Sequence, residues 1–216
     1  AFLARSVIVC EGASEVGLIR GLDHYWTSLN GNSMLSAGTA FVNVGGGEPD
    51  RCFVRGLALS RLGYRVLVLV DADKPPTPAT VEAFEAAGGE HITWRAGRAL
   101  EDELFMSLPD AGVDALLQRG IELMEEELVA AHIQTQSNGQ VTLAHIRQQR
   151  HLIGGPYSPD IRQLLGLTAR NRRNGWFKSV TRYEDVAHDI LGPHLPASDA
   201  GFQALISRLY WWAHAA

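Results

Sequence analysis

The stretch that decides the fold of this chain reads Arg65-Val66-Leu67-Val68-Leu69-Val70-Asp71-Ala72-Asp73. A short run of Val and Leu is typical of a strand buried on both faces of a parallel sheet. The two carboxylates then follow the carboxyl end of the strand, where ligands bind in open α/β sheets. Residues i and i+2 of an extended segment point the same way, so Asp71 and Asp73 can converge on one hard cation. The alternative is a helix cap or a turn, which the downstream Lys74-Pro75-Pro76 supports.

Strands alternate with helical patterns over the first half of the chain. Apolar runs predict three further strands at residues 6–10, 40–44 and 91–94, and helical patterns occupy residues 14–26, 49–63 and 78–87, the first with Ser14 as N-cap. Strands separated by helices imply right-handed crossovers and a parallel sheet. We therefore expect an α/β fold with a four-stranded, mainly parallel sheet and flanking helices.

The pattern changes to helices only after residue 100. Helical periodicity predicts helices at residues 103–107, 113–132, 143–151, 161–167, 183–191 and 199–213. We expect an α/β core at residues 1–106, an inserted all-helical subdomain at 107–174, and C-terminal helices at 175–216 that complete the core.

Composition is that of an ordinary soluble globular protein, with 216 residues, 46% hydrophobic residues and a net charge of −5. No apolar stretch approaches the roughly 20 residues that span a bilayer, and the start lacks the layout of a signal peptide. Cys10 and Cys52 lie far apart without metal-type spacing, so a reducing cytoplasm is the expected location. A start without Met suggests a fragment. No Walker A loop, GxSxG elbow or HExxH motif appears.

Further acids follow the other strands. Glu11 comes directly after the first strand and shares the sheet edge with Asp71 if the strands are parallel, and Gly12 allows the sharp turn into a helix. Glu15 can face the same side only if this turn is tight, and otherwise it favours the helix N-terminus. After the fourth strand, Glu101 and Glu103 share a direction in an extended segment, whereas a helix would split them.

Several carboxylates at one sheet edge repel one another unless cations neutralise them. Oxygen ligands favour Mg²⁺ or Mn²⁺ over zinc or copper. With enough carboxylates, two ions can clamp the attacking and leaving oxygens of a phosphodiester. The acids therefore favour metal-dependent phosphodiester hydrolysis.

A locally basic stretch complements these acids. Between Arg147 and Arg182 there are eight basic side chains and a single acid, Asp160. Such a stretch can bind a phosphate backbone, and Lys178 is the best candidate for a buried cation that stabilises transition-state charge. The alternative is a solvated loop or a surface that balances the acidic helix at residues 122–127. The DNA-binding residues that we expect are Arg170, Arg172, Arg173, Lys178 and Arg182.

A glutamate after the first strand and an Asp-X-Asp after the third resemble the Toprim fold, shared by topoisomerases, primases, RecR-like proteins and nucleases. Glu15, the segment Leu100-Glu101-Asp102-Glu103-Leu104 and the segment Trp176-Phe177-Lys178-Ser179-Val180-Thr181 look most like the nucleases of the OLD (overcoming lysogenization defect) family, of class 2. Pro75 stands where topoisomerases and primases have a third acid, and no tyrosine can be assigned to DNA breakage and rejoining, which disfavours both.

The resemblance implies a DNA endonuclease dependent on two Mg²⁺ or Mn²⁺ ions, with Glu11, Asp71 and Lys178 as catalytic residues. It implies metal ligation by Glu11, Glu15, Asp71, Asp73, Glu101 and Glu103. Family members also carry an N-terminal ABC-type ATPase domain, absent from this sequence, so the chain would be the nuclease region of a longer protein that can form a homodimer.

Two other functions stay open at this point. A non-catalytic Toprim module would bind DNA or a protein partner without turnover, although binding alone would not need Glu15, Glu101 and Glu103. A phosphotransferase or phosphatase with an Asp nucleophile would form a phosphoryl-aspartate, which metal-dependent hydrolysis would not.

Overall fold

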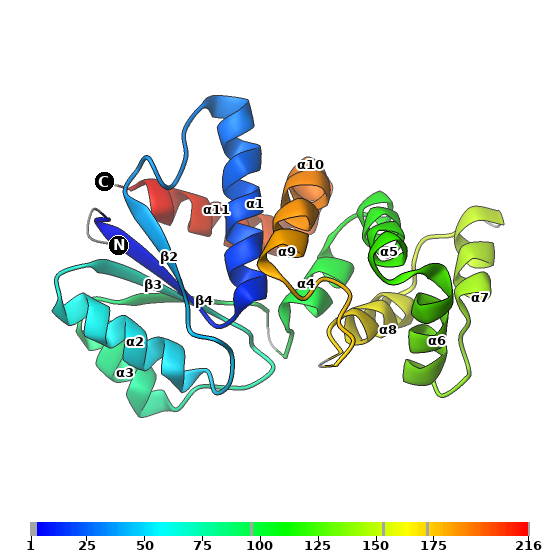
Figure 1. Ribbon diagram of the computed structural model, residues 1–216, viewed down its shortest axis with the longest axis horizontal. Helices are drawn as coiled ribbons and strands as arrows, with labels where there is room; N and C mark the ends of the chain where they lie inside the picture. The colour runs from blue at the N-terminus through cyan, green and yellow to red at the C-terminus, as the bar shows by residue number, and fades with distance from the viewer. Residues whose placement is uncertain (1–3, 96, 153, 172, 216) are drawn as a thin grey trace.

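One sheet of four parallel strands organises the computed structural model, which describes residues 4–95, 97–152, 154–171 and 173–215 (Figure 1). The strands are β1 (Ser6–Cys10), β2 (Thr39–Asn43), β3 (Arg65–Val70) and β4 (Glu90–Thr93), in the order β2-β1-β3-β4. β1 pairs with β3 in parallel, with Cys10 opposite Leu69. The expected α/β fold is confirmed, and the sheet is entirely parallel.

Two hydrophobic layers cover the faces of the sheet. Val7 and Val9 pack towards α2 (Asp50–Arg61) and α3 (Pro78–Ala86), together with Phe53 and Phe84. The alternate β1 side chains belong to the larger core, which includes α1 (Ala13–Asn30) and the C-terminal helices. Figure 1 shows α2 and α3 on one side of the sheet and α1 on the other. Because the central strands β1 and β3 are covered on both faces, a ligand can reach them only at their ends.

The helical stretch extends away from the carboxyl ends of the strands (Figure 1). It contains α4 (Leu100–Ser107), α5 (Asp110–Met124), α6 (Glu126–Gln136), α7 (Leu143–Arg147), a π-helical turn at Gln148–Leu152, and α8 (Pro159–Ala169).

The helix expected at residues 113–132 is wrong as a single element. The chain breaks at Glu125, which has a φ of 69° and separates α5 from α6. A positive φ is uncommon for a residue other than glycine, and the surrounding Met-Glu-Glu-Glu sequence contains no helix breaker.

The C-terminal segment returns to the core and contacts both α1 and the sheet. Its elements are α9 (Val180–Val186), a π-helical turn at Ala187–Leu191, α10 (Gly192–His194), a 3₁₀ turn at Leu195–Ala197, and α11 (Ala200–His214). A Cβ at Gly17 of α1 would lie 2.3 Å from the carbonyl oxygen of Val180, and one at Gly21 would lie 2.1 Å from that of Glu184. These glycines let α1 and α9 meet backbone to backbone.

α11 also contacts the sheet. The hydroxyl of Thr39 on β2 donates to the carbonyl of Ala213 at 2.8 Å, and the Trp212 indole N–H donates to Glu90 at 2.9 Å. The division of the chain at residues 106 and 174 stays a prediction. Within the described part of the chain, every helix is too short or too polar to span a lipid bilayer.

Candidate functional site

A cavity of about 940 Å³ lies at the carboxyl edge of the sheet. Its walls come from the segments after β1, β2 and β3, from the start of α4, from the ends of α6 and α8, and from the segment before α9. The acids that line it are Glu11, Glu15, Glu48, Asp71, Asp73 and Glu101, and the basic residues are Lys74, Arg170 and Lys178. Segments that are as far apart in the sequence as Glu11 and Lys178 therefore contribute to one site.

Glu11 and Asp71 are positioned by neighbouring backbone groups. The Oε2 atom of Glu11 accepts a hydrogen bond from the backbone N–H of Asp71 at 3.3 Å, which links the ends of β1 and β3. The Oδ1 atom of Asp71 accepts from the N–H of Leu100, the first residue of α4, at 3.1 Å. The backbone N–H of Ala72 donates to the carbonyl of Arg98 at 2.9 Å. The parallel sheet brings the two acids to one edge, as the sequence predicts.

Glu15 caps α1 from inside the helix. The N-cap is Gly12 rather than the expected Ser14, and the Oε2 atom of Glu15 accepts the N–H of Gly12 at 2.8 Å. This is the reciprocal half of a capping box, which satisfies an N–H that the helix leaves unpaired. The tight turn at Gly12 also makes the Glu15 side chain part of the cavity wall. Glu15 thus both faces the same cavity as Glu11 and caps the N-terminus of α1, the two roles that the sequence left as alternatives.

The carboxylates of the cavity destabilise one another's charged forms. Burial, followed by the charges of Glu101 and Glu11, raises the pKa of Glu15 to about 7. Burial, followed by the charges of Glu15, Glu101 and Glu11, raises the pKa of Asp71 to about 9. Burial raises the pKa of Glu11 as well. Clustered oxygen ligands with unfavourable mutual charge are a donor set that fits a hard divalent cation.

Glu101 lies at the start of α4 and is buried, with a side chain that lines the cavity. Burial raises its pKa, while the Tyr183 hydroxyl and the Lys178 ammonium oppose this shift. Burial, followed by the charge of Glu101, raises the pKa of Tyr183. The Tyr183 hydroxyl is buried and makes no hydrogen bond of ordinary geometry among the described residues.

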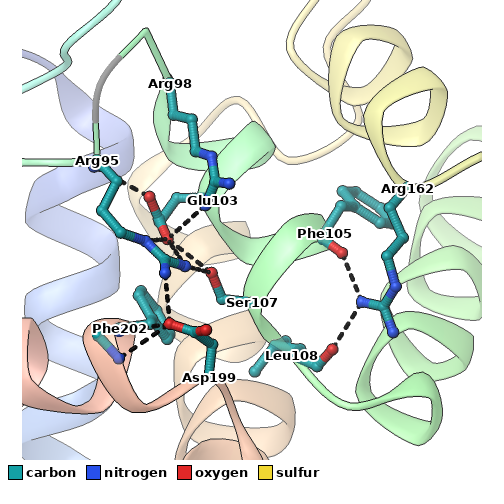
Figure 2. Close-up of polar contacts among 10 residues, drawn as sticks. Arg95, Arg98, Glu103, Phe105, Ser107, Leu108, Arg162, Asp199 and Phe202 are labelled. Atoms are coloured by element: carbon teal, nitrogen blue, oxygen red, sulfur yellow. Dashed lines mark hydrogen bonds and ion pairs between the residues drawn. The ribbon is translucent and has the colours of Figure 1, made fainter. Parts of the chain in front are cut away.

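Glu103 does not line the cavity, which corrects the expectation that it shares a direction with Glu101. The segment is helical, so the two side chains diverge. The Glu103 carboxylate is fully buried and accepts from the Arg95 guanidinium at 2.6 and 2.8 Å, from the Ser107 hydroxyl at 2.6 Å and from Arg98 at 3.2 Å (Figure 2). The Arg95 hydrogen bonds hold the pKa of Glu103 below its usual value against the effect of burial. Its role in this structure is to join α4 to the segment after β4.

Asp73 pairs with a cation of the protein itself. Its Oδ2 atom lies 3.2 Å from Nη1 of Arg170, and the same nitrogen lies 3.2 Å from Oδ2 of Asp102. Asp102 also accepts the N–H of Ala99 at 3.1 Å and so caps α4 as Glu15 caps α1. Arg170 therefore bridges the segment after β3 and the start of α4.

Lys178 is exposed, which corrects the expectation of a buried cation. It nevertheless lines the cavity, and its Nζ atom donates to the carbonyl of Asn171 at 2.5 Å. The side chain lies over Gly175, where an added Cβ would be 2.5 Å from Cε of the lysine. The absence of a side chain at residue 175 thus allows the lysine stem to reach the acidic wall.

Most of the basic stretch is occupied by ion pairs or backbone contacts. Arg147 pairs with Glu126 and Arg150 with Asp114, in agreement with a surface that balances acidic helices. Figure 2 shows Arg162 donating to the carbonyls that end α4.

The other arginines expected to bind DNA differ in position. Arg182 donates to the carbonyl of Trp176 at 3.2 Å and is partly buried, whereas Arg173 is exposed. Arg172 lies outside the described residues. Of the four expected residues that the structure describes, Arg170 and Lys178 line the cavity.

No three His, Cys, Asp or Glu side chains form a ready-made metal-binding group in the described ranges. Two carboxylates of the cavity have other partners: Glu15 accepts from Gly12, and Asp73 pairs with Arg170. The donor set nevertheless fits a hard cation by its chemistry, because a carboxylate that accepts one hydrogen bond keeps lone pairs for a metal ion.

Residues 2–73 match the family model described as "Overcoming lysogenization defect protein-like, TOPRIM domain". Over these residues, one third of the chain, the sequence resembles an OLD-like Toprim domain. The match includes Glu11, Glu15, Asp71 and Asp73 and ends before Glu101 and Lys178. No curated protein and no solved structure matches the chain. An OLD-like Toprim domain indicates a metal-binding module of the nuclease type.

The sequence reasoning missed Asp102 and Tyr183. Asp102 could have been found as the third residue of an acid-rich helix start, which is the position that reaches back to the N-cap. Tyr183 has no local signal, because its contact with Glu101 depends on the return of α9 to the α/β core.

Proposed function

We propose that this OLD-like Toprim chain is the nuclease region of a DNA endonuclease that uses two Mg²⁺ or Mn²⁺ ions. The observation that carries the proposal is the gathering of Glu11, Glu15, Asp71 and Glu101 around one cavity at the carboxyl edge of the sheet. Their raised pKa values mean that the folded protein disfavours the charged carboxylates when no cation neutralises them. A protein that only needed a stable fold would gain nothing from this arrangement.

Each acid has a defined part in the proposal. Glu11 and Asp71 hold the cation at the end of the two central strands, where backbone hydrogen bonds fix both carboxylates. Glu15 and Glu101 supply further oxygen ligands from α1 and α4, and Asp73 supplies one from the segment after β3. Divalent cations bound there would supply Lewis acidity and lower the pKa of coordinated water. Glu103 is not part of this set, since its carboxylate is committed to Arg95, Arg98 and Ser107.

The basic residues of the cavity act on the phosphate. Lys178 lies close enough to Glu101 to lower its pKa, so a phosphodiester held over the acids would lie beside the ammonium group. There the lysine stabilises negative charge on the departing oxygen. We propose DNA as the substrate, and an N-terminal ABC-type ATPase domain and a second copy of the full-length protein as partners, on the resemblance to OLD-family proteins.

Cleavage of plasmid DNA in Mg²⁺ or Mn²⁺ tests the proposal, with Asp71→Asn as the inactive variant. The matched control is Asp160→Asn, which changes an exposed aspartate in the first turn of α8 outside the cavity. We expect nicking or linearisation by the wild-type chain and by the control, a loss of at least about a hundredfold in Asp71→Asn, and no cleavage in EDTA. Equal cleavage by the wild-type chain and Asp71→Asn refutes the proposal.

A second candidate is a Toprim module that binds DNA without cleaving it. The observations that favour it are the ion pair of Asp73 with Arg170 and the lack of a ready-made metal group among the described residues. Gel-shift and cleavage assays on the same preparation separate the two functions. Binding that is equal in EDTA and Mn²⁺, without turnover, supports the module, whereas metal-dependent turnover supports the nuclease.

A further inference from the structure

Arg170 lies on a backbone that is fixed on two sides. It follows the last residue of α8, its N–H donates to the carbonyl of Gly166 at 3.0 Å, and the N–H of Trp176 donates to the carbonyl of Ala169 at 3.0 Å. α8 itself lies directly on α4, since a Cβ at Gly166 would be 2.9 Å from Cα of Asp102. The base of the side chain is therefore held in place, while the guanidinium is partly exposed at the cavity.

The guanidinium is shared between two carboxylates of different exposure. Asp73 has 36% of its side chain exposed, and Asp102 has 11%. Asp102 has a second hydrogen bond, from the N–H of Ala99, so its place is set by α4 whether or not Arg170 is there. Asp73 has no comparable support among the interactions of the described residues, and Arg170 is the contact that directs its Oδ2 atom.

We propose that Arg170 is an internal counter-ion that occupies Asp73 in the metal-free protein and is displaced from it by the divalent cation. The proposal rests on the nuclease function above, in which Asp73 is a ligand. An arginine keeps its charge at every physiological pH, so it can leave the carboxylate only by movement of the side chain. A compact divalent ion binds carboxylate oxygens more strongly than a delocalised guanidinium at a partly exposed pair does.

The displaced guanidinium stays at the cavity, because its backbone is held by α8 and by Trp176. Its planar set of N–H donors suits the two oxygens of a phosphate group. Loading of the metal and affinity for a phosphodiester would then be coupled through one side chain. Two ligands that each bind better in the same state of the protein bind cooperatively.

The test is Mn²⁺ affinity, measured from the electron paramagnetic resonance signal of free Mn²⁺ at constant ionic strength. Arg170→Gln removes the competing charge, and we expect it to bind Mn²⁺ about three- to tenfold more tightly than the wild-type chain. The matched control is Arg208→Gln, which breaks the ion pair of an exposed arginine with Glu90 outside the cavity and should leave the affinity unchanged. Arg170→Lys keeps a positive charge, so its Mn²⁺ affinity should lie between those of the wild-type chain and Arg170→Gln. This variant provides the test if Arg170→Gln fails to fold.

A second measurement follows the phosphate. Binding of a phosphorothioate DNA duplex, whose backbone resists hydrolysis, should strengthen with Mn²⁺ in the wild-type chain and strengthen less in Arg170→Gln. If the wild-type chain binds Mn²⁺ and the Arg170 variants bind it equally or more weakly, the displacement of Arg170 by the cation is refuted and the nuclease proposal stands. A wild-type chain that takes up no Mn²⁺ at millimolar concentration refutes both.

Discussion

Replacement of Glu15 by glutamine should stabilise the metal-free protein at alkaline pH. Glu15 is buried, and its pKa of about 7 stands above the ordinary value of 4.5. The folded protein therefore holds a proton on Glu15 more tightly than the unfolded chain does, and stability falls as the pH rises from about 4.5 to about 7. Each unit of pKa difference corresponds to about 1.4 kcal/mol, so the charged Glu15 costs the folded state about 3 kcal/mol above this window.

Glutamine removes that charge and keeps the shape. Its side-chain oxygen can still accept the N–H of Gly12, so the cap of α1 is retained. In EDTA, we expect Glu15→Gln to raise the free energy of unfolding by about 3 kcal/mol near pH 8 and to change it little near pH 4.5. The wild-type chain, but not the variant, should recover most of this difference when Mg²⁺ is added.

The assay is urea denaturation followed by circular dichroism at several pH values, with and without Mg²⁺. The matched control is Glu127→Gln, which neutralises an exposed glutamate in the first turn of α6 and should change stability by only a few tenths of a kcal/mol. If Glu15→Gln is less stable than the wild-type chain in EDTA near pH 8, the electrostatic reasoning is wrong. In that case the charge of Glu15 serves the helix terminus alone.

Two further substitutions test the assignments of single residues. Glu103→Gln should lower the free energy of unfolding by about 2–3 kcal/mol, because it breaks a buried ion pair with partly exposed arginines, and should leave Mn²⁺ affinity unchanged. Because the pKa of Glu103 is lowered, the stability that its carboxylate contributes to the fold is present above about pH 4.5 and is lost as the pH falls further. Urea denaturation near pH 3 should therefore show a smaller difference between Glu103→Gln and the wild-type chain. A Glu103→Gln variant as stable as the wild-type chain at neutral pH would contradict this role. Gly175→Ala should displace the side chain of Lys178 and lower the cleavage rate about tenfold or more, with unchanged Mn²⁺ affinity. The control is Gly155→Ala, at a position with room for a methyl group, and this variant should cleave normally. Equal rates for the two glycine variants in a plasmid assay would remove Lys178 from the site.

The central part of the fold could be predicted because its strands follow from local patterns of apolar residues. Short apolar runs gave the strands of the sheet, and a carboxylate directly after a strand has to lie at its carboxyl edge, which placed Glu11 and Asp71 correctly. Glu103 could not be placed this way. Its direction depends on whether α4 begins at Leu100 or later, and a shift of this kind decides which acids face the cavity.

Contacts between distant segments were beyond the reach of sequence patterns. Arg170 lies 97 residues from Asp73, and only the packing of α8 on α4 brings the two together. Arg150 and Arg162 looked available for DNA in the sequence, yet the helical stretch uses them to bind its own acids and carbonyls. The break at Glu125 also lacks a signal, since its neighbours favour a continuous helix.

The backbone contact between α1 and α9 has a consequence for the order in which the site is completed. Gly17 and Gly21 let α9 pack closely against α1, and Lys178 lies just before α9, so the lysine is in place only after α9 has docked. A ribosome releases Glu11, Glu15 and Asp71 long before it releases Lys178. The acidic half of the pocket can therefore fold while the chain is still being made, and the pocket gains its lysine only when α9 has packed on α1.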